Sequence, residues 1–377
     1  MQGTKGRRIY IHLEYDLDAA LWQQRYNAGL LPDKTPYGYH YLETWGYHLT
    51  FSKSHEEVKP VKLLRRAANR LLGFDLWHAW RNRKRMGSVE AILTNSEREY
   101  LAILLLRKVG ISSTSPLLVA NSIWLYDIWE KLSRWKHRFY HWLVRGDART
   151  VLTAHSEENL KSGRLLFPNM RGELINFGIS LEAFPLKPPA LEYNERGPRP
   201  LRLLSLGNDP WRDWETLMGA VEGNNDVQLR IGTDLSHKYN RPLRRVAANS
   251  KQITVEFISP LERLREAYEW SDIVVVTTMP NRHASGLTVA LEAVTAGKPV
   301  IATDTGGLKG YFHDDEIYYV PIRDIEALAA AIKECVTRGD ATLSRAENAQ
   351  AKLLSAELTT EGFASRHVAL IENVLSS

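Results

Sequence analysis

The residues from Trp270 to Leu308 constrain the fold of this chain more than any other segment. They begin with a short apolar run at residues 273–277, typical of a buried strand. A Gly-containing turn follows, then an apolar stretch at about residues 289–296, a Gly-Lys-Pro break, and a second short apolar run at residues 300–303. This order predicts strand–loop–helix–strand, a unit that places backbone N–H groups and a helix N-terminus where an anion can bind.

The rest of the C-terminal half repeats this alternation of short apolar strands and helices. The further strands are expected at residues 201–206, 227–231, 253–257 and 318–320, and the further helices at 214–221, 261–268 and 325–336. Such alternation is typical of a parallel sheet that is covered on both faces. We therefore predict a doubly wound α/β domain.

The N-terminal half is less regular but follows a similar plan. Strands are expected at residues 8–13, 47–51, 91–94, 117–120 and 150–153, with a helix at about 39–45. A chain of 377 residues is too long for one ordinary core. We expect a first domain over residues 1–180, a second over 181–358, and a last helix over 359–377 that returns to the first. The Pro- and Gly-rich stretch at about residues 178–200 is the expected linker.

Composition limits where the chain works. It has 44% hydrophobic and 25% charged residues, which is typical of a globular protein. Cys335 is the only cysteine, so a disulfide framework is excluded and a reducing compartment is favoured. We find no signal peptide and no apolar run near the roughly 20 residues that span a bilayer. We expect a cytoplasmic protein, or one peripheral to the inner face of the cytoplasmic membrane.

Charge is divided unevenly between the two halves. Residues 1–185 carry 27 Lys and Arg against 18 Asp and Glu, whereas the remaining residues carry 22 against 26. The net charge is therefore +9 in the first half and −4 in the second. This asymmetry predicts that only the first half meets an anionic surface or substrate.

The loop and helix after the strand at 273–277 carry a specific constellation. Gly286 opens the helix, Glu292 lies a few residues in, and Gly297-Lys298-Pro299 and Thr305-Gly306-Gly307 follow. This pattern resembles the donor site of GT-B glycosyltransferases, in particular the retaining family 4. The resemblance covers residues 175–340 well and the first 175 residues weakly. It implies two Rossmann-like domains facing across a cleft, with a nucleotide diphosphate sugar held by the second domain.

The resemblance assigns the donor-binding residues. Backbone N–H groups of Gly286, Leu287 and Thr288 would bind phosphate, and Glu292 would accept hydrogen bonds from the ribose hydroxyls. Gly207 and Asn208 would begin the phosphate-contacting loop. Arg212 stands near the position of the family's lysine and would neutralise the leaving diphosphate. The alternative for Arg212 is a solvated side chain at a helix start, where the helix dipole disfavours a cation.

One position departs from the family pattern. The family has two glutamates eight positions apart, and the first of them falls at Ala284. His283 and Ser285 are the candidates to contact the sugar instead, so we name His283, Arg212 and Glu292 as the catalytic candidates. A purely structural role for His283 is the alternative.

The acceptor is expected on the N-terminal domain. The loop around Gly38 takes the place of the family's Gly-rich loop, and its tyrosines would either stack on a sugar face or simply pack. The family's active-site histidine falls near Asn121, where no histidine stands, and His155 is another candidate. Asp18 and Asp33 lie near the first strand as further carboxylates. The predicted acceptor-binding residues are Asp16, Tyr37, Gly38, Tyr39 and Asn121.

Two basic segments carry interleaved aromatic residues. Residues 61–85 have leucines on one helical face and Lys or Arg on the other, followed by Trp77 and Trp80, and residues 131–149 form a similar patch. This pattern favours an anionic membrane surface, and the alternative is a core-facing helix with solvated charges. No nucleic-acid-binding motif and no metal-ligand spacing accompany them, so no nucleic acid, metal or cofactor is expected.

The expected activity is transfer of a hexosyl group, from a UDP-sugar in the first instance, to an acceptor hydroxyl. The acceptor would be a lipid-linked glycan of exopolysaccharide or lipopolysaccharide synthesis, and the family implies retention of configuration. A sucrose-phosphate-synthase-like enzyme is a second reading; the chain lacks the pyridoxal-binding lysine context of a phosphorylase. From another class, the chain would be a non-catalytic nucleotide-sugar-binding subunit of a membrane-associated complex.

Overall fold

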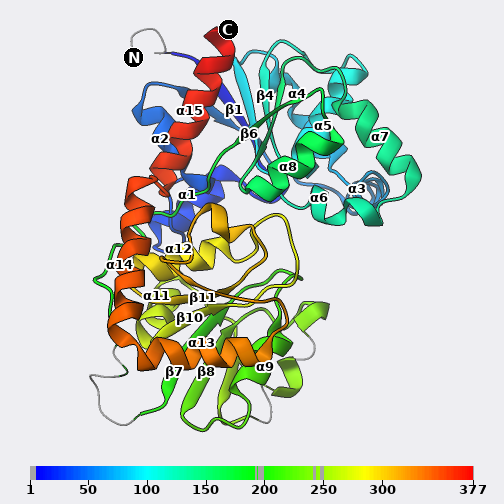
Figure 1. Cartoon of the computed structure of the whole chain (residues 1–377). Helices are drawn as coiled ribbons and strands as arrows, with labels where there is room; N and C mark the ends of the chain where they lie inside the picture. Colours follow the sequence, from blue (N-terminus) through cyan, green and yellow to red (C-terminus); the bar gives the residue numbers. More distant parts are fainter. Residues whose placement is uncertain (1–5, 192, 194–198, 241–242, 247–249, 377) are drawn as a thin grey trace. The chain divides into compact units, whose positions relative to one another are not determined.

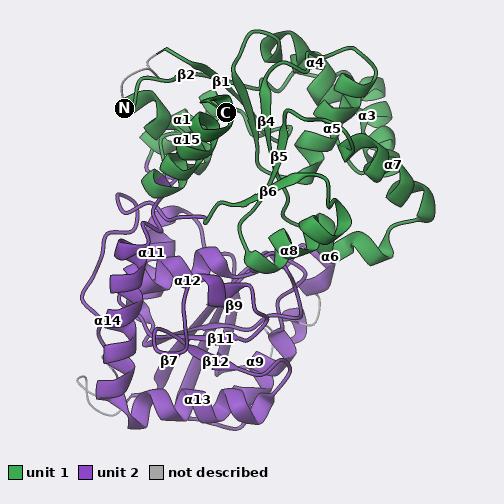
Figure 2. Cartoon of the chain, turned by 45° about the horizontal axis from the view of Figure 1, so that its top comes forward, with its two compact units in different colours: residues 1–28, 33–176, 361–377 green, residues 29–32, 177–360 purple. Residues whose placement is uncertain are grey.

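The computed structural model describes residues 6–191, 193, 199–240, 243–246 and 250–376. The chain divides into two compact units (Figure 2). Unit 1 comprises residues 1–28, 33–176 and 361–377, and unit 2 comprises residues 29–32 and 177–360. Each unit contains one six-stranded parallel sheet with helices packed on it (Figure 1). The prediction of an α/β fold with two Rossmann-like domains is confirmed.

Unit 2 contains a sheet with the strand order β12-β11-β10-β7-β8-β9. Its strands are β7 (Leu201–Leu206), β8 (Val227–Gly232), β9 (Ile253–Glu256), β10 (Ile273–Val276), β11 (Val300–Thr303) and β12 (Tyr318–Val320). Its helices are α9 (Trp214–Val221), α11 (Leu261–Trp270), α12 (Leu287–Thr295), α13 (Ile325–Thr337) and α14 (Gly339–Ser355).

The apolar strands of unit 2 contribute side chains to two hydrophobic cores, one on each face of the sheet. Successive side chains of a strand point to opposite faces of the sheet. Accordingly Leu204 and Val274 join one buried cluster, with α12 and α14, while Leu203 and Ile273 join the other, with α9 and α13. Both faces are therefore covered, which is why these strands are almost uniformly apolar in the sequence.

Unit 1 contains a sheet with the strand order β2-β1-β3-β4-β5-β6. Its strands are β1 (Arg8–His12), β2 (His48–Phe51), β3 (Ala91–Thr94), β4 (Leu117–Asn121), β5 (Thr150–Ala154) and β6 (Arg171–Leu174). Its helices are α1 (Ala19–Asn27), α2 (His40–Thr44), α3 (Lys59–Leu72), α4 (Leu76–Met86), α5 (Glu97–Lys108), α6 (Leu125–Ile128), α7 (Arg134–Val144), α8 (Glu157–Leu166) and α15 (Thr360–Ser376).

Helices α4, α5 and α7 gather on one side of the unit 1 sheet, with α1 and α15 on the other (Figure 2). The last helix, α15, belongs to unit 1 from residue 361 onward. Its Glu372 accepts a hydrogen bond from the Tyr47 hydroxyl at 2.8 Å and pairs with Arg7 at 3.2 Å. These contacts fix the end of the chain to the N-terminal unit.

Most predicted strands coincide with observed ones to within one or two residues. Strand β6 and helices α1, α5, α6, α8 and α14 are additional to the prediction. The expected linker at about residues 178–200 includes residues 192 and 194–198, which lie outside the described residues. Within the described ranges, no helix is both long enough and apolar enough to cross a membrane.

Each sheet has a point at which the strand order reverses. In unit 2 the first strand in the chain, β7, lies between β8 and the fourth strand, β10. In unit 1 the equivalent point lies between β1 and β3. In open parallel sheets, ligands bind beside the carboxyl ends of the strands at such a switch point. The fold therefore directs attention to the loops that follow β7 and β10, and to those that follow β1 and β3.

Gly178, near the start of unit 2, tests how closely the backbone of this segment packs against residue Thr359. A Cβ atom on Gly178 would lie 2.0 Å from the carbonyl oxygen of Thr359, which is backbone and cannot yield. We expect Gly178→Ala to lower the free energy of unfolding by about 2–3 kcal/mol, as overpacking typically does. Urea unfolding of the variant beside Gly87→Ala, where a Cβ meets nothing nearer than 3.9 Å, would check this. Equal stability of the two variants would contradict it.

Candidate donor-binding site

The loop after β7 is folded tightly around one arginine. Gly207 ends the strand, and a Cβ atom there would lie 1.9 Å from Nε of Arg212. Only glycine leaves room for the guanidinium to lie along the backbone. Asn208 is exposed, and its side-chain oxygen accepts a hydrogen bond from the backbone N–H of Asp234 at 2.6 Å. The first two predicted loop residues therefore shape the turn and tie it to the loop after β8.

Arg212 is buried rather than solvated. Its side chain is only 4% exposed, and its Nε lies 3.2 Å from a carboxylate oxygen of Asp209. Burial lowers the pKa of the guanidinium, and the Asp209 charge opposes that shift. Among the described residues, neither Nε nor Nη1 has a hydrogen-bond partner, although Nε lies within ion-pair distance of Asp209. The structure thus excludes the alternative of a solvated helix-start arginine.

Backbone contacts join the loops that follow β7 and β10. The N–H of Asp213 donates to the carbonyl of Thr277 at 3.1 Å, and the N–H of Met279 donates to that of Trp211 at 2.7 Å. Between them, Arg212 and Thr278 form an isolated antiparallel bridge. The two loops at the switch point are therefore one connected structure.

The start of α12 completes this structure. Gly286 caps the helix with φ +88°, a left-handed conformation that favours glycine. A Cβ atom there would lie 2.2 Å from Val276 and 2.8 Å from Nη1 of Arg212. The guanidinium therefore faces the N-terminus of a helix, whose dipole is unfavourable for a cation unless an anion joins them.

Ser285 links the helix start to the acidic partner of Arg212. Its hydroxyl donates to Asp209 at 2.9 Å, and its backbone N–H donates to the side-chain oxygen of Asn281 at 2.9 Å. Leu287 is buried and Thr288 is exposed. The predicted residues Gly207, Arg212, Ser285 and Gly286 are thus brought together at the switch point.

Glu292 lies further along α12 and is buried. It accepts a hydrogen bond of 2.6 Å from the hydroxyl of Tyr268 on α11. Burial raises the pKa of Glu292 to about 7, and the Tyr268 hydrogen bond works against that rise. A carboxyl group whose pKa is raised close to neutral pH is characteristic of functional sites, although buried structural pairs also shift pKa values.

His283 and Ala284 lie between the strand and the helix. The His283 ring meets Trp211 edge-to-face, with the ring centroids 4.8 Å apart, and is half-buried. Ala284 is buried with φ +58°, an uncommon conformation for a residue with a side chain. A Cβ atom on Gly307 would lie 2.8 Å from the Cα of Ala284, so the turn after β11 packs directly on this residue.

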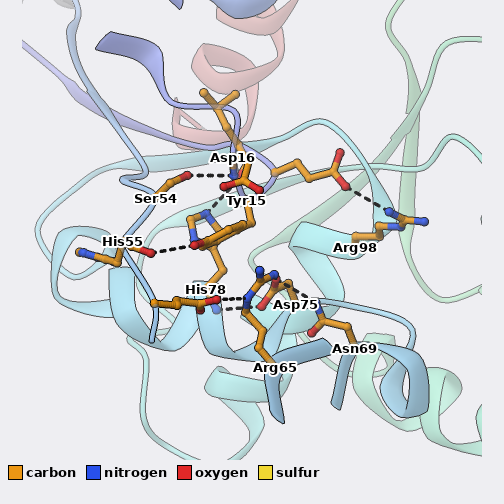
Figure 3. A network of polar contacts seen from close by, with 12 residues as sticks. Tyr15, Asp16, Ser54, His55, Arg65, Asn69, Asp75, His78 and Arg98 are labelled. Atoms are coloured by element: carbon orange, nitrogen blue, oxygen red, sulfur yellow. Dashed lines mark hydrogen bonds and ion pairs between the residues drawn. The ribbon is translucent and has the colours of Figure 1, made fainter. Parts of the chain in front are cut away.

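The predicted acceptor residues lie in unit 1. Asp16 follows β1 at that unit's switch point, with φ +72°, and its N–H donates to the Ser54 hydroxyl at 2.9 Å (Figure 3). Beside it, the Tyr15 hydroxyl donates to the carbonyl of His55 at 2.7 Å, and the Arg65 guanidinium lies 3.7 Å from the Tyr15 ring centroid. The loop after β1 is thus held by β2's loop and by α3.

The tyrosines around Gly38 behave differently from one another. Tyr39 is fully buried, donates its hydroxyl to Asn95 at 2.9 Å and packs against Phe363 of α15. For Tyr39 the structure thus favours packing over stacking on a sugar. Gly38 is also buried, whereas Tyr37 is half-buried.

Asn121 and His155, the two alternatives for the family's histidine position, are neighbours. The Asn121 amide lies 2.9 Å from Nε2 of His155, whose Nδ1 lies 2.9 Å from the carbonyl of Ile175. Because a carbonyl oxygen can only accept a hydrogen bond, Nδ1 donates to Ile175 and Nε2 accepts from the Asn121 amide. Burial lowers the pKa of His155 to about 4, so the ring is neutral.

Three residues of the unit 2 site were missing from the sequence prediction. Asp209 holds both Arg212 and Ser285, and its place in the loop after β7 was an available signal. Tyr268 gives no such signal, because it lies on another helix, 24 residues before Glu292. Asn281 resembles an ordinary loop residue in the sequence. In the described part of the chain, no group of three or more His, Cys, Asp or Glu could hold a metal ion.

The pKa of Glu292 yields a stability prediction. In the folded chain this carboxyl stays protonated up to about pH 7, whereas its ordinary pKa is 4.5, so stability falls as pH rises through this interval. Glutamine at position 292 cannot ionise. We therefore expect the difference in free energy of unfolding between Glu292→Gln and wild type to shift in favour of the variant by on the order of 2–3 kcal/mol when the pH rises from 5 to 8. Urea unfolding at both pH values measures this. A gain that is the same at both would contradict it.

Comparison by sequence identifies part of unit 2. Residues 212–338 match the model of the family described as Glycosyl transferases group 1. This range begins at Arg212 and contains the whole β10–α12 loop. No curated protein matches the chain in a sequence search.

Comparison by structure covers both units. The chain is similar to sucrose-phosphate synthase from Thermosynechococcus elongatus, with a TM-score of 0.73 and 17% identity over 98% of this chain and 100% of that one. It is similar to HepE from Anabaena in complex with UDP and glucose, at 0.67 and 15% over 97% and 99%. An E. coli trehalose-6-phosphate structure bound with UDP-2-fluoro glucose gives 0.62 and 13% over 84% and 79%.

These matches agree with the resemblance noted in the sequence. The structural neighbours share the arrangement of two Rossmann-like domains, and the family match supports a hexosyltransferase. The chain therefore has the GT-B fold, and its residues 212–338 carry the sequence pattern of the group 1 glycosyl transferases.

Proposed function

We propose that the chain transfers a hexosyl residue from a UDP-sugar to an acceptor hydroxyl. The observation that carries the proposal is the buried Arg212, whose unused Nη1 faces the N-terminus of α12 at the switch point of unit 2. Two positive features in one buried place repel each other. A diphosphate would relieve this repulsion, since its oxygens accept from both the guanidinium and the backbone N–H groups.

A diphosphate bound between Arg212 and the start of α12 would give each neighbouring group a role. Arg212 would stabilise the charge that develops on the departing UDP, which in comparable sites contributes roughly 3–4 kcal/mol. Glu292, one to two turns along α12, would accept the ribose hydroxyls in its ionised form. His283 and Ser285, on the loop before the helix, are the groups we assign to the sugar. We propose that no metal or other cofactor takes part.

Uridine is the base we favour. HepE from Anabaena has been solved in complex with UDP and glucose and with UDP-glucose, and the E. coli structure is bound with UDP-2-fluoro glucose. As in the related family, we propose transfer with retention. The acceptor would be a lipid-linked glycan of exopolysaccharide or lipopolysaccharide synthesis, bound by unit 1 near Asp16, Tyr37, Gly38 and Asn121.

Association with an anionic membrane is the second part of the proposal. Helix α3 carries three of its four leucines outward: Leu63 and Leu64 are each 71% exposed, and Leu71 is 63% exposed. Its one buried residue is Arg65. An ordinary surface helix buries its apolar face and exposes its arginines. The outward leucines, together with the exposed Lys62, Arg66 and Arg70 on the same helix, support docking at a lipid interface.

Because the first family glutamate is absent, a second function is also consistent with the site: binding of a nucleotide sugar without catalysis. With Ala284 in that position, a non-catalytic subunit that only binds the nucleotide sugar would retain Arg212, Gly286 and Glu292. Incubating the purified protein with UDP-, GDP- and ADP-sugars, with and without a membrane-lipid extract, separates the two. Release of UDP that rises with the extract supports the transferase, whereas tight UDP binding without release from any donor supports the subunit.

Arg212 provides the sharper test of the donor site. We expect Arg212→Lys to lower kcat for UDP release at least about 100-fold, because lysine cannot fill the fork between Gly207 and Gly286. Arg263→Lys is the matched control, since Arg263 is half-exposed and pairs with Glu256 away from the switch point. Steady-state kinetics of UDP release from the preferred donor measure both. Unchanged kcat in Arg212→Lys would rule out the phosphate role.

Charge reversal tests the membrane surface. We expect the double variant Lys62→Glu, Arg66→Glu to bind phosphatidylglycerol vesicles on the order of 100-fold less tightly, at about 1 kcal/mol per charge near the surface. The control reverses Lys251 and Lys333, which are exposed on unit 2. Vesicle co-sedimentation at fixed ionic strength measures both variants. Equal binding by the two would count against docking through α3.

A further inference from the structure

An apolar groove runs over unit 1 beside helix α3. Its volume is about 460 Å³, and its walls come from α3, α4, α5 and the residues just after α5. We call it the α3–α5 groove. Its apolar lining residues are Val61, Leu64, Ala68, Leu76, Trp77, Trp80, Leu105, Leu106, Val109 and Ile111. Protein pockets that take small ligands fall roughly in the range 300–1,000 Å³, so this volume suits a ligand rather than a whole protein surface.

The groove has one charged lining residue, and that charge is already paired. Arg65 lies 2.9 Å from Glu57 and 2.6 Å from Asp75, with its guanidinium stacked on the ring of Tyr15 (Figure 3). Asn69 also donates to Asp75, at 2.9 Å. With two carboxylates beside one guanidinium, the positive charge of Arg65 is more than offset, so the groove itself presents carbon surface and no unpaired cation. Its occupant should itself be apolar.

The rim of the groove is exposed and apolar. Leu64 is 71% exposed, Val109 52% and Ile111 48%. Isolated exposed leucines are common, but a contiguous apolar patch around a cavity marks a binding site. In this structure a hydrocarbon chain would cover these side chains together with Trp77 and Trp80.

The charge around the groove identifies the other end of the ligand. Helices α3 and α4 contain no Asp or Glu, and they carry Lys59, Lys62, Arg66, Arg70, Arg81, Arg83, Lys84 and Arg85 in addition to Arg65. The two helices that supply most of the groove's walls are therefore strongly cationic. The complementary molecule has a hydrocarbon chain and an anionic head, as a lipid phosphate does.

We propose that the α3–α5 groove binds the hydrocarbon chain of the lipid-linked acceptor. The inference rests on the proposed function, because it takes the acceptor to be lipid-linked. Arg65 connects the groove to the switch point of unit 1, since it lines the groove and stacks on Tyr15, the neighbour of Asp16. A hydrocarbon chain in the groove would place its head group beside the loop after β1. An acceptor needs this position, whereas a bulk membrane lipid does not.

The first experiment uses alkyl phosphates as probes, below their micelle concentrations. We expect dodecyl phosphate to bind at least about 100-fold more tightly than butyl phosphate, because each added methylene is removed from water. Titration is followed by tryptophan fluorescence, and the signal should fall in the double variant Trp77→Phe, Trp80→Phe. Equal affinity of both probes, or no binding of dodecyl phosphate, would overturn the proposal and favour an amphipathic helix of a partner protein as the occupant.

A matched pair of double variants separates the groove from the membrane-facing side of α3. Leu64→Gln with Ile111→Gln alters the groove, whereas Leu63→Gln with Leu71→Gln alters leucines of similar exposure that do not line it. We expect the first to bind dodecyl phosphate at least about 10-fold less tightly and the second to bind it within about 2-fold of wild type. Equal losses would mean general lipid docking and overturn the proposal.

The last arm links the groove to turnover. UDP release by the wild-type protein, stimulated by membrane-lipid extract, is compared with that of the Leu64→Gln, Ile111→Gln variant over a range of extract concentrations. We expect the variant to need at least about 10-fold more extract for half-maximal stimulation. Unchanged stimulation would show that the acceptor chain lies elsewhere. If the wild-type protein releases no UDP, the proposed function fails, while the alkyl phosphate titration still decides whether the groove binds a chain.

Discussion

The burial of Arg212 against the start of α12 is the interaction on which the unit 2 site depends. A guanidinium in the interior is costly, and Asp209 compensates it only on one side. The chain accommodates it with two glycines: Gly207 leaves room along one edge of the side chain, and Gly286 leaves room along the other. The two loops that carry these glycines are hydrogen-bonded to each other. The anion-binding site that we propose here would thus be assembled before any anion arrives, which lowers the entropic cost of binding.

The sheet topology explains why these loops meet. Because β7 and β10 are adjacent while their connections leave in opposite directions, the carboxyl ends of both strands are free of crossing helices. Unit 1 reaches the same condition between β1 and β3 with a different strand order. There the loop after β1 contains no buried arginine. It is held by contacts of Tyr15 and Asp16 with Ser54, His55 and Arg65 from other segments. The contrast fits a phosphate-binding role for one unit and a more variable ligand for the other.

Helix α3 shows how an electrostatic cluster can help to hold a helix whose one fully buried side chain is an arginine. Arg65 ties the helix to Glu57 and Asp75, and Leu63, Leu64 and Leu71 remain exposed. A buried pair of this kind contributes little net stability compared with an apolar replacement. Its consequence here is orientation: the apolar face is displayed and borders the α3–α5 groove.

The sequence by itself determined the α/β class, most strand positions and the residues of the β10–α12 loop, because short apolar strands, breaking glycines and helical periodicity are local properties. The resemblance of its motifs to the GT-B donor site also singled out Arg212 and Glu292. Only the tertiary structure decided that Arg212 is buried, that Asp209 and Tyr268 are the partners, and that Asn121 and His155 share a hydrogen bond. It also turned the leucines of α3 outward. These outcomes depend on which distant segments the sheet order brings side by side, and periodicity along the chain does not contain that information.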